Sequence, residues 1–490
     1  MQFIGIDIGS SSIKASVIDG ETGVCIVSAN YPKVELKINS PFPGWAEQNP
    51  DIWWESTKES IRLLHKSPDF DKKQIGSIGI AYQMHGLVAV DKDLIPVRPS
   101  IIWCDSRAVE IGDKAFAEIG EEKCLKNYLN SPGNFTVSKL KWVKENEPEI
   151  YNKIYKIMLP GDYIAMKMTG EINTTISGLS EGILWDFKEN NIARSLLEHY
   201  GIDESVLPGI VPTFGLQGEL SQKAAKELGL TPGTKITYRS GDQPNNALSL
   251  NVLNPGEIAA TAGTSGVVYG VSDEIKYDPL SRVNTFAHVN HTSGNTSLGV
   301  LLCINGTGIL NSWLKKLTGI QSYDEMNSLA ANVSIGSDGL IILPFGNGAE
   351  RIFQNKNIGS QILNLDFNRH TQGHIIRAAH EGIAFSFKYG MEIMEETGIE
   401  ANVIRAGNAN MFLSPVFRET LAGITGATIE LYNTDGSIGA ARGAGIGLGY
   451  FKSAKDAFAN LKIVKIIKPK KNEIINDVYQ TWKRKLKSNL

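Results

Sequence analysis

Apolar residues dominate the start of the chain and are broken by one cluster of small polar residues. The stretch Ile4–Ser16 reads IGIDIGSSSIKAS, so two apolar runs flank Gly9 and three serines, Ser10, Ser11 and Ser12. This pattern predicts two strands joined by a tight hairpin, because small residues let the backbone turn sharply. The N–H groups and hydroxyls of such a turn are free to bind an anion.

The same pattern returns in the second half of the chain. Glu257–Val271 reads EIAATAGTSGVVYGV, in which two apolar runs flank Gly263, Thr264, Ser265 and Gly266. Repetition of one supersecondary plan indicates two domains of related design. We therefore expect the two anion-binding turns to face each other across one nucleotide.

Asp7 interrupts the first apolar run just before the turn. A carboxylate beside a phosphate-binding turn would repel the phosphate unless a divalent cation bridges the two groups. Asp7 therefore indicates a magnesium–nucleotide site. The alternative is an ordinary serine-rich edge hairpin, since short Gly/Ser motifs recur by chance.

A helix is predicted after this hairpin. In PGWAEQNPDIWWES, Asn49 is placed to cap a helix and Pro50 to occupy its first turn. The two tryptophans Trp53 and Trp54 then begin an amphipathic pattern that reaches about His65. These aromatic residues are expected in the core.

The next strand breaks at a polar pair followed by glycine. Ile75–Val90 alternates apolar residues and is interrupted by Gln83, Met84, His85 and Gly86. Polar groups at the end of a strand often contact a small ligand, so Met84 and His85 are candidate binding residues. The alternative is a structural role, because a lone histidine is more often a core residue whose hydrogen bonds are satisfied within the protein.

Two carboxylates also stand at predicted strand ends. Asp105 follows Ile101–Trp103 and precedes Arg107, so this pair either grips ligand hydroxyls or closes a helix start as an ion pair. Asp242 follows Lys235–Gly241, where the glycine lets the backbone turn close to a ligand. A helix cap is the structural alternative for Asp242.

Length and composition bound the class of protein. A chain of 490 residues is too long to fold around one hydrophobic core and suggests two domains, which we place at 1–243 and 244–490. A net charge of −3 gives no electrostatic footprint for nucleic acid or an anionic membrane. The four cysteines lack C-x-x-C spacing and predict buried thiols of a reducing compartment. The start lacks a secretory pattern, and no apolar run reaches membrane-spanning length, so a cytoplasmic protein is expected.

The quoted motifs occur together in one family. DIGSSSIK and TAGTSGV resemble the two phosphate loops of the actin-like ATPase superfamily, and specifically of the FGGY carbohydrate kinases. WAEQNPDIWW, QMHG, WCDSR and the Gly241–Asp242 pair follow in that family's order, so the resemblance covers nearly the whole chain. It implies an α/β fold of two actin-like (ribonuclease H-like) domains around an interdomain cleft. QMHG and WAEQNPDIWW are most similar to the xylulokinases of the family.

The resemblance implies an ATP-dependent kinase of a ketopentose, with D-xylulose and its 5-phosphate as the first expectation. Asp242 would accept the proton of a sugar hydroxyl, which is too weak an acid to ionise first. Asp7 would hold Mg²⁺. The expected sugar-binding residues are Met84, His85, Asp105 and Gln243. The expected nucleotide-binding residues are Gly9, Ser10, Ser11, Ser12, Gly263, Thr264, Ser265, Gly308, Gly407, Asn408 and Asn410.

Two departures from the family pattern leave alternatives open. Gln243 follows the aspartate as in glycerol kinases, and Gly407–Asn410 reads GNAN where the family usually carries GGGA. Ribulose, a deoxy-ketose, glycerol or gluconate are therefore alternative substrates. A more distant alternative is a non-catalytic switch driven by ATP. The expected partners are the sugar and ATP, without nucleic acid or membrane, and a homodimer is implied by the family alone.

Overall fold

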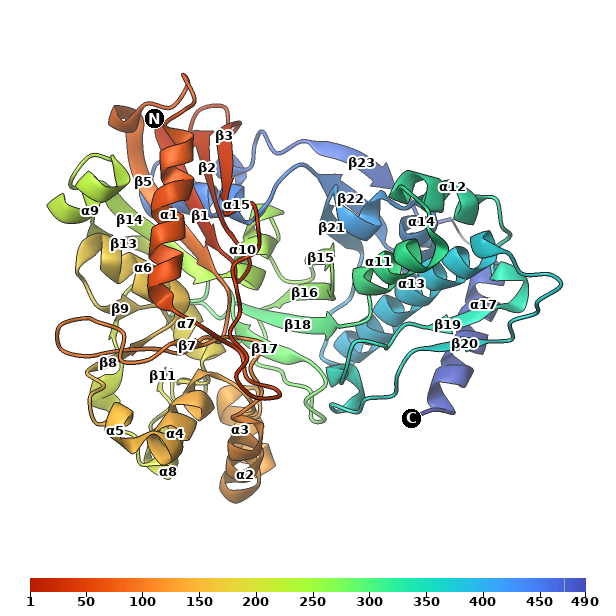
Figure 1. Ribbon diagram of the computed structural model, residues 1–490, viewed down its shortest axis with the longest axis horizontal. Coiled ribbons are helices and arrows are strands. Elements are labelled where there is room, and N and C mark those ends of the chain that lie inside the picture. Colours follow the sequence, from red (N-terminus) through yellow and green to blue (C-terminus); the bar gives the residue numbers. More distant parts are fainter. Residues whose placement is uncertain (471) are drawn as a thin grey trace.

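The computed structural model describes residues 1–470 and 472–490, and these residues form two large β-sheets, the first at the left of Figure 1 and the second nearer its centre. The strands of the first sheet run in the order β13-β14-β5-β1-β2-β3 and those of the second in the order β17-β18-β16-β15-β21-β22-β23. The strands of the first sheet are β1 (Gln2–Ile8), β2 (Ile13–Asp19), β3 (Cys25–Tyr31), β5 (Ile75–Tyr82), β13 (Phe214–Glu219) and β14 (Lys235–Gly241). Those of the second are β15 (Ile258–Ala262), β16 (Gly266–Ser272), β17 (Asn284–Ala287), β18 (Leu298–Ile304), β21 (Val403–Gly407), β22 (Thr428–Tyr432) and β23 (Ile463–Ile467).

The two sheets share one plan. The central strand β1 pairs antiparallel with β2 and parallel with β5, and the central strand β15 pairs antiparallel with β16 and parallel with β21. In both sheets the hairpin is extended by a further antiparallel strand, and the parallel side by a further parallel strand. Both predicted hairpins, and the related design of the two halves, are therefore confirmed.

Helices pack around these sheets, and the shorter strands pair with one another in two-stranded sheets. The helices of the first half are α1 (Pro50–Leu64), α2 (Val109–Ile119), α3 (Glu121–Tyr128), α4 (Thr136–Asn146), α5 (Pro148–Tyr151), α6 (Pro160–Thr169), α7 (Ile176–Glu181), α8 (Arg194–Tyr200), α9 (Gln222–Leu228) and α10 (Asp242–Ser249). Those of the second half are α11 (Gly308–Thr318), α12 (Tyr323–Ala331), α13 (Gln372–Glu396), α14 (Pro415–Thr425), α15 (Gly436–Gly447), α16 (Ala454–Ala457) and α17 (Glu473–Lys487). The short strands are β4 (Glu47–Gln48), β6 (Val88–Val90), β7 (Ser100–Ile101), β8 (Lys156–Met158), β9 (Asn173–Thr174), β10 (Trp185–Asp186), β11 (Asn191–Ile192), β12 (Gly209–Ile210), β19 (Ile341–Leu343) and β20 (Gln361–Leu363).

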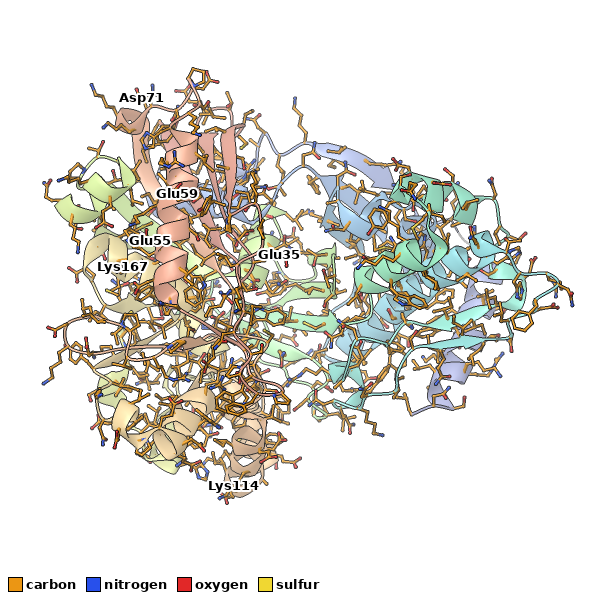
Figure 2. All side chains as sticks on the ribbon, viewed as in Figure 1. Glu35, Glu55, Glu59, Asp71, Lys114 and Lys167 are labelled. Carbon is orange, nitrogen blue, oxygen red and sulfur yellow. The ribbon has the colours of Figure 1, made fainter. Side chains whose placement is uncertain are left out.

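The helix α1 forms as predicted. The Asn49 side chain accepts a hydrogen bond from the backbone N–H of Asp51 at 3.0 Å, which caps the helix. Trp53 and Trp54 are buried against the first sheet. Figure 2 shows Glu55 and Glu59 on the side of α1 that faces away from this sheet. The predicted aromatic core positions are therefore confirmed.

The helix α15 comes from late in the chain but packs on the first sheet, where Figure 1 shows it beside β1 and β2. Glycines on both sides make this close approach possible. A Cβ atom on Gly5 would overlap the backbone of Ser437 and Ala441, and one on Gly79 would overlap the carbonyl of Ala440. The first sheet is thus covered by α1 on one face and by α15 on the other.

This packing predicts that Gly79→Ala destabilises the fold. The added methyl group must displace the backbone of α15, and such overpacking costs about 1–3 kcal/mol. Gly294→Ala is the matched control, because open space surrounds that glycine. Urea unfolding should show a lower midpoint for Gly79→Ala and an unchanged midpoint for the control. Equal urea midpoints for Gly79→Ala and Gly294→Ala would mean that α15 can shift to accommodate the methyl group without a loss of stability.

In the part of the chain that the structure describes, no helix is long and apolar enough to cross a membrane. The thiol of Cys124 is buried as expected. The prediction of buried thiols is wrong for Cys104, which is exposed because it follows the short strand β7 into an open loop.

Candidate functional site

The first anion-binding turn joins β1 to β2 and is held from behind by backbone contacts. Gly9 N–H donates to the carbonyl of Ser12 at 3.1 Å, and the carbonyl of Ser11 accepts from Leu36 N–H at 2.8 Å. The side-chain amide of Gln48 donates to the carbonyl of Ser10 at 2.7 Å. Because these carbonyls are engaged on the protein side, the turn keeps one shape.

Asp7 stands at the end of β1, opposite Lys14 of β2. Lys14 Nζ pairs with Asp435 Oδ2 at 2.5 Å, and Asp435 caps α15 through the N–H groups of Ser437 and Ile438. Burial, and then the charge of Asp435, raise the pKa of Asp7 to about 6, although Lys14 lowers it. A second cation, in addition to Lys14, would reduce the electrostatic repulsion between the carboxylates of Asp7 and Asp435. Sequence reasoning misses Asp435 because it lies far along the chain.

Hard oxygen ligands at this position suit Mg²⁺, which uses one or two carboxylates and takes its other ligands from phosphates and water. Among residues 1–470 and 472–490, no group of three or more His, Cys, Asp or Glu side chains is placed to hold a metal alone. The arrangement therefore fits a cation that a bound phosphate helps to hold. Asp7, with Asp435 behind it, is the carboxylate available for that cation.

Asp242 is the first residue of α10 and directly follows β14. The helix cap is Gly241, so the cap interpretation of Asp242 is wrong by one residue. Burial, and then the charge of Asp7, raise the pKa of Asp242 to about 7. Asn245 of the same helix donates to the carbonyl of Gly436 at 2.8 Å. The end of β14 is thereby tied to the start of α15 and placed beside Asp7.

Met84 and His85 lie in the break that follows β5, close to the same strand end. A Cβ atom on Gly241 would overlap Met84 and Glu181. His85 adopts a positive φ of 60°, and its ring lies within hydrogen-bond distance of the carbonyl of Glu181, at 2.9 Å. Burial lowers the pKa of His85 to about 3, so the ring is neutral. Lys139 Nζ donates to the carbonyl of His85 at 2.8 Å.

Glu181 is a further residue of this site that sequence reasoning misses. It ends α7, is 1% exposed, and neither carboxyl oxygen has a hydrogen-bond partner among the described residues. Burial, and then the charges of Asp242 and Asp162, raise its pKa well above the usual value. Its sequence neighbourhood, SGLSEGILWD, carries no catalytic pattern that would have found it.

Asp105 is placed differently from the other candidate sugar residues. Its carboxylate is buried and accepts hydrogen bonds from Arg107 Nη2 at 2.7 Å and from the N–H of Ala46 at 2.6 Å. This geometry corresponds to the ion-pair alternative. Trp103, which the sequence did not single out, is 52% exposed and its Nε1 lies 3.4 Å from Ser10 Oγ. Gln243 is half-buried in the first turn of α10.

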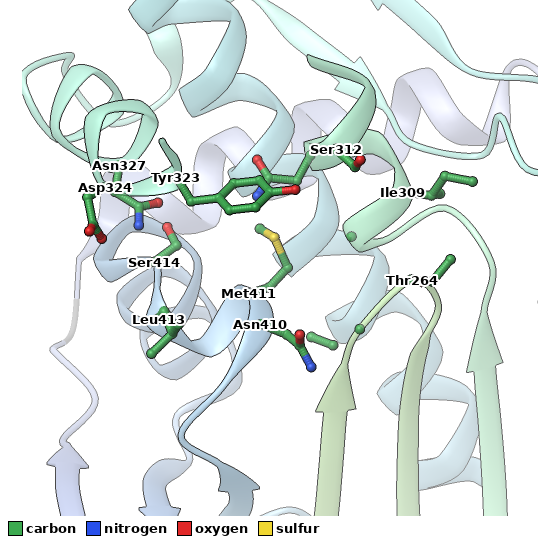
Figure 3. Close-up of a pocket in the computed structure, with 14 residues that line it drawn as sticks. Thr264, Ile309, Ser312, Tyr323, Asp324, Asn327, Asn410, Met411, Leu413 and Ser414 are labelled. Carbon is green, nitrogen blue, oxygen red and sulfur yellow. The ribbon is translucent and has the colours of Figure 1, made fainter. Parts of the chain in front are cut away.

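The second turn borders a cavity of about 440 Å³ in the other half of the molecule (Figure 3). Gly308 N–H, at the start of α11, donates to the carbonyl of Gly263 at 2.9 Å. Of the expected nucleotide residues, Gly263, Thr264, Gly308 and Asn410 line this cavity. Among the described residues, its lining does not include Ser265, Gly407 or Asn408. The lining also contains Tyr323, Asp324, Asn327 and Ser414, which sequence reasoning misses because no motif marks them.

The two anion-binding turns lie in the two domains of one known protein family. Residues 2–249 match the N-terminal domain of the FGGY family of carbohydrate kinases, and residues 258–448 match its C-terminal domain. The chain belongs to this family. It is therefore a carbohydrate kinase, a phosphotransferase with an alcohol group as acceptor, and the family implies ATP as its phosphoryl donor.

Curated relatives of this kinase cover nearly its whole length. A xylulose kinase of Staphylococcus epidermidis is 30% identical over 488 residues, which is 98% of this chain and 94% of the relative. A xylulose kinase of Bacillus subtilis is 29% identical over 461 residues, covering 92% and 89%.

Solved structures resemble the fold of the kinase. A xylulose kinase from Rhodospirillum rubrum aligns with a TM-score of 0.89 at 25% identity, covering 100% of this chain and 99% of that one. A gluconate kinase from Lactobacillus acidophilus aligns with a TM-score of 0.89 at 21% identity, covering 99% and 98%. The α/β fold with two actin-like halves is thereby confirmed.

Proposed function

We propose that this sugar kinase transfers the γ-phosphoryl group of MgATP to a hydroxyl of a ketopentose, D-xylulose in first place, with Asp242 as the general base. The observation that carries the proposal is the meeting of two groups at the end of β14. Asp242 lies within the electrostatic influence of Asp7 at the first turn, and Gly241 packs against Met84 on the other side. The curated relatives named xylulose kinase favour the ketopentose.

Asp242 would take the proton of the attacking hydroxyl as the phosphoryl group transfers. A base works best when its pKa lies near the operating pH, and the pKa of Asp242 is raised to about 7. Met84, His85 and Gln243 would position the sugar. Asp105 would act indirectly, because its bonds to Arg107 and to the N–H of Ala46 fix the conformation of the loops beside the site.

The two turns would hold the nucleotide. Backbone N–H groups of Ser10–Ser12 and Gly263–Ser265 would bind phosphates, with Gly9 closing the first turn, and Gly308 and Asn410 would border the nucleoside end. Gly407, the last residue of β21, and Asn408, which follows it, lie outside the lining and would support Asn410. Bound Mg²⁺ would supply charge neutralisation on the phosphates, and Asp7 is the residue that would hold it.

Two wider features belong to the same proposal. We place the two functional halves at 1–243 and 244–490, so that Asp242 closes the sugar half. A homodimer is the assembly state that the family suggests. Light scattering of the purified kinase would give twice the mass of the chain for a dimer and the mass of one chain otherwise.

A substrate panel tests the proposal. ADP release would be followed with MgATP and D-xylulose, D-ribulose, 1-deoxy-D-xylulose, glycerol or D-gluconate, with a sugar-free reaction as control. We expect the highest kcat/KM with D-xylulose. A preference for glycerol or gluconate would overturn the sugar assignment and keep the kinase. Turnover that no sugar stimulates would favour the ATP-driven switch.

The pH dependence of kcat/KM should show an acidic limb near Asp242's raised pKa. The base must be ionised to accept a proton, so activity should fall in proportion to the ionised fraction as the pH drops below about 7. Initial rates at constant ionic strength would measure this limb. A flat profile from neutral to mildly acidic pH would contradict the assignment of the base.

Gly308→Ala should weaken nucleotide binding. A Cβ atom at Gly308 would overlap the carbonyl of Gly263, so α11 must shift away from the second turn. We expect the KM for MgATP to rise by about tenfold, from a strain of about 1–3 kcal/mol. Gly319→Ala at the other end of α11 is the control: its φ of 71° makes it lower stability without changing KM. Equal KM values in both variants would contradict this role.

A further inference from the structure

The second half of the molecule contains another cavity, of about 540 Å³, which the kinase reaction does not use. It is formed where α12, α13 and α14 meet β23 and the start of α17, a region visible in Figure 1. Apolar side chains such as Val416, Ile467 and Ile475 form part of its wall. It therefore has the size and mixed lining of a site for a small organic molecule.

The charged groups of this cavity are mostly cationic. Lys465, Lys468 and Lys470 line it from β23 and the following loop, whereas Glu419 is the carboxylate of the lining. Among the described residues, these three lysines have no carboxylate within 4.0 Å. Such a concentration of unpaired positive charge raises the local concentration of anions.

Arg418 of α14 is the buried cation of the site. It is 8% exposed, and its Nη1 donates to the carbonyls of Phe412 and Leu413 at 3.2 Å each. Its Nε is buried without a hydrogen-bond partner, and no carboxylate of the described residues forms an ion pair with it. A buried guanidinium that is not ion-paired is unfavourable, although the charge of nearby Glu419 offsets part of this cost, and an anion in the cavity would add the missing negative charge.

Two helix starts add to the positive potential. Pro415 begins α14 and Asn472 caps α17, and both residues line the cavity. Side-chain caps already bond one N–H group at each of these starts, and the dipole of a helix N-terminus favours an anion. We propose that this cavity binds the phosphate group of a small molecule and that this ligand regulates nucleotide binding.

The regulation follows from walls that the two cavities share. The helix α12 lines the nucleotide cavity through Tyr323 and Asn327 and the second cavity through Ala331. At the other wall, Ser414 faces the nucleotide cavity and Pro415, the next residue, faces the second one. Arg418 bonds directly to the 3₁₀ turn Asn410–Leu413, which borders the nucleotide cavity. A phosphate held by Arg418 therefore acts on a segment that both sites share.

Equilibrium binding tests this proposal with two probes, inorganic phosphate and D-glucose 6-phosphate. Calorimetric titrations of the full chain would be run with and without saturating MgADP. We expect a phosphate site that stays available when MgADP is bound, with the affinities of probe and nucleotide changed by one common factor, as linkage requires. Free phosphate and a phosphate ester share this chemistry, and the ratio of their affinities tells which of them the site takes.

Variants locate the site. Lys465→Gln/Lys468→Gln, which changes two exposed lysines of β23 and the following loop, should weaken probe binding by about tenfold or more, the equivalent of one charge-assisted hydrogen bond. Arg418→Met should do the same, and the double lysine variant decides the question if Arg418→Met does not fold. Lys455→Gln, an exposed lysine of α16, is the control and should bind like the parent. Absence of binding, complete displacement by MgADP, or an unchanged affinity in the lysine variant would overturn the proposal.

Discussion

Asp242→Asn should lower kcat by about 10²- to 10⁴-fold, the usual contribution of a general base. Asparagine keeps the shape of the side chain at the start of α10 but cannot accept the proton of a sugar hydroxyl. The loss should appear in kcat, because the sugar and the nucleotide still meet the same surface. Steady-state rates, with calorimetric titrations of the sugar and of a non-hydrolysable ATP analogue, would separate these effects.

The matched control for this variant is Asp273→Asn, which removes one carboxylate from an exposed position. It should keep the parental kcat, so that a change in net charge alone is excluded. The acidic limb of the pH profile should also disappear from the residual activity of Asp242→Asn. An Asp242→Asn enzyme as active as its parent would mean that another group takes the proton, and Glu181, whose charge is coupled to Asp242, would then be the first residue to test.

The sequence predicts those parts of the site whose residues are neighbours in the chain. A hairpin turn, a strand that breaks at Met84 and a strand that ends at Asp242 each show in a few neighbouring residues. Local patterning is enough there, because alternating apolar residues on both sides of a turn of small residues are the local signal of two strands joined by a hairpin. Both hairpins and both strand ends are found where the pattern predicts them.

The parts that the sequence does not predict depend on contacts between distant segments. Asp435 reaches Lys14 because α15 packs on the first sheet, and no local sequence pattern predicts that packing. The burial of Asp105 is of the same kind. Its neighbour Arg107 is visible in the sequence, but the N–H of Ala46, which donates to the same carboxylate oxygen, Oδ2, lies on a separate loop. Sequence reasoning therefore finds the elements of the site and misses what the folded chain adds to them.

Asp7→Asn should change activity and stability in opposite directions. Loss of the carboxylate should lower kcat/KM for MgATP by about 10²-fold or more, the scale of one electrostatic contact in the transition state. The same change should stabilise the free kinase, because a partly buried carboxylate near Asp435 is replaced by a neutral group. The gain should be about 1–3 kcal/mol, from a pKa raised to about 6.

The sign of the pH dependence makes this prediction specific. The folded-state pKa of Asp7 lies above its ordinary value of 3.8, so ionisation disfavours the fold above about pH 6 and has no effect below 3.8. The stabilisation by Asp7→Asn should therefore be largest near neutral pH and vanish in acid. Thermal unfolding across this range would measure it, and the extra stabilisation that Mg²⁺ gives with ADP should be lost in the variant.

Asp19→Asn is the matched control, since Asp19 ends β2 of the same hairpin. Burial acts to raise its pKa, but hydrogen bonds from Thr22 lower the pKa of Asp19 overall, so its carboxylate favours the fold. This control should lose stability or stay unchanged, and it should keep the parental KM for MgATP. If Asp7→Asn also failed to gain stability at neutral pH, the carboxylate of Asp7 would be compensated within the free protein. A cation would then not be needed to explain its place beside the first turn.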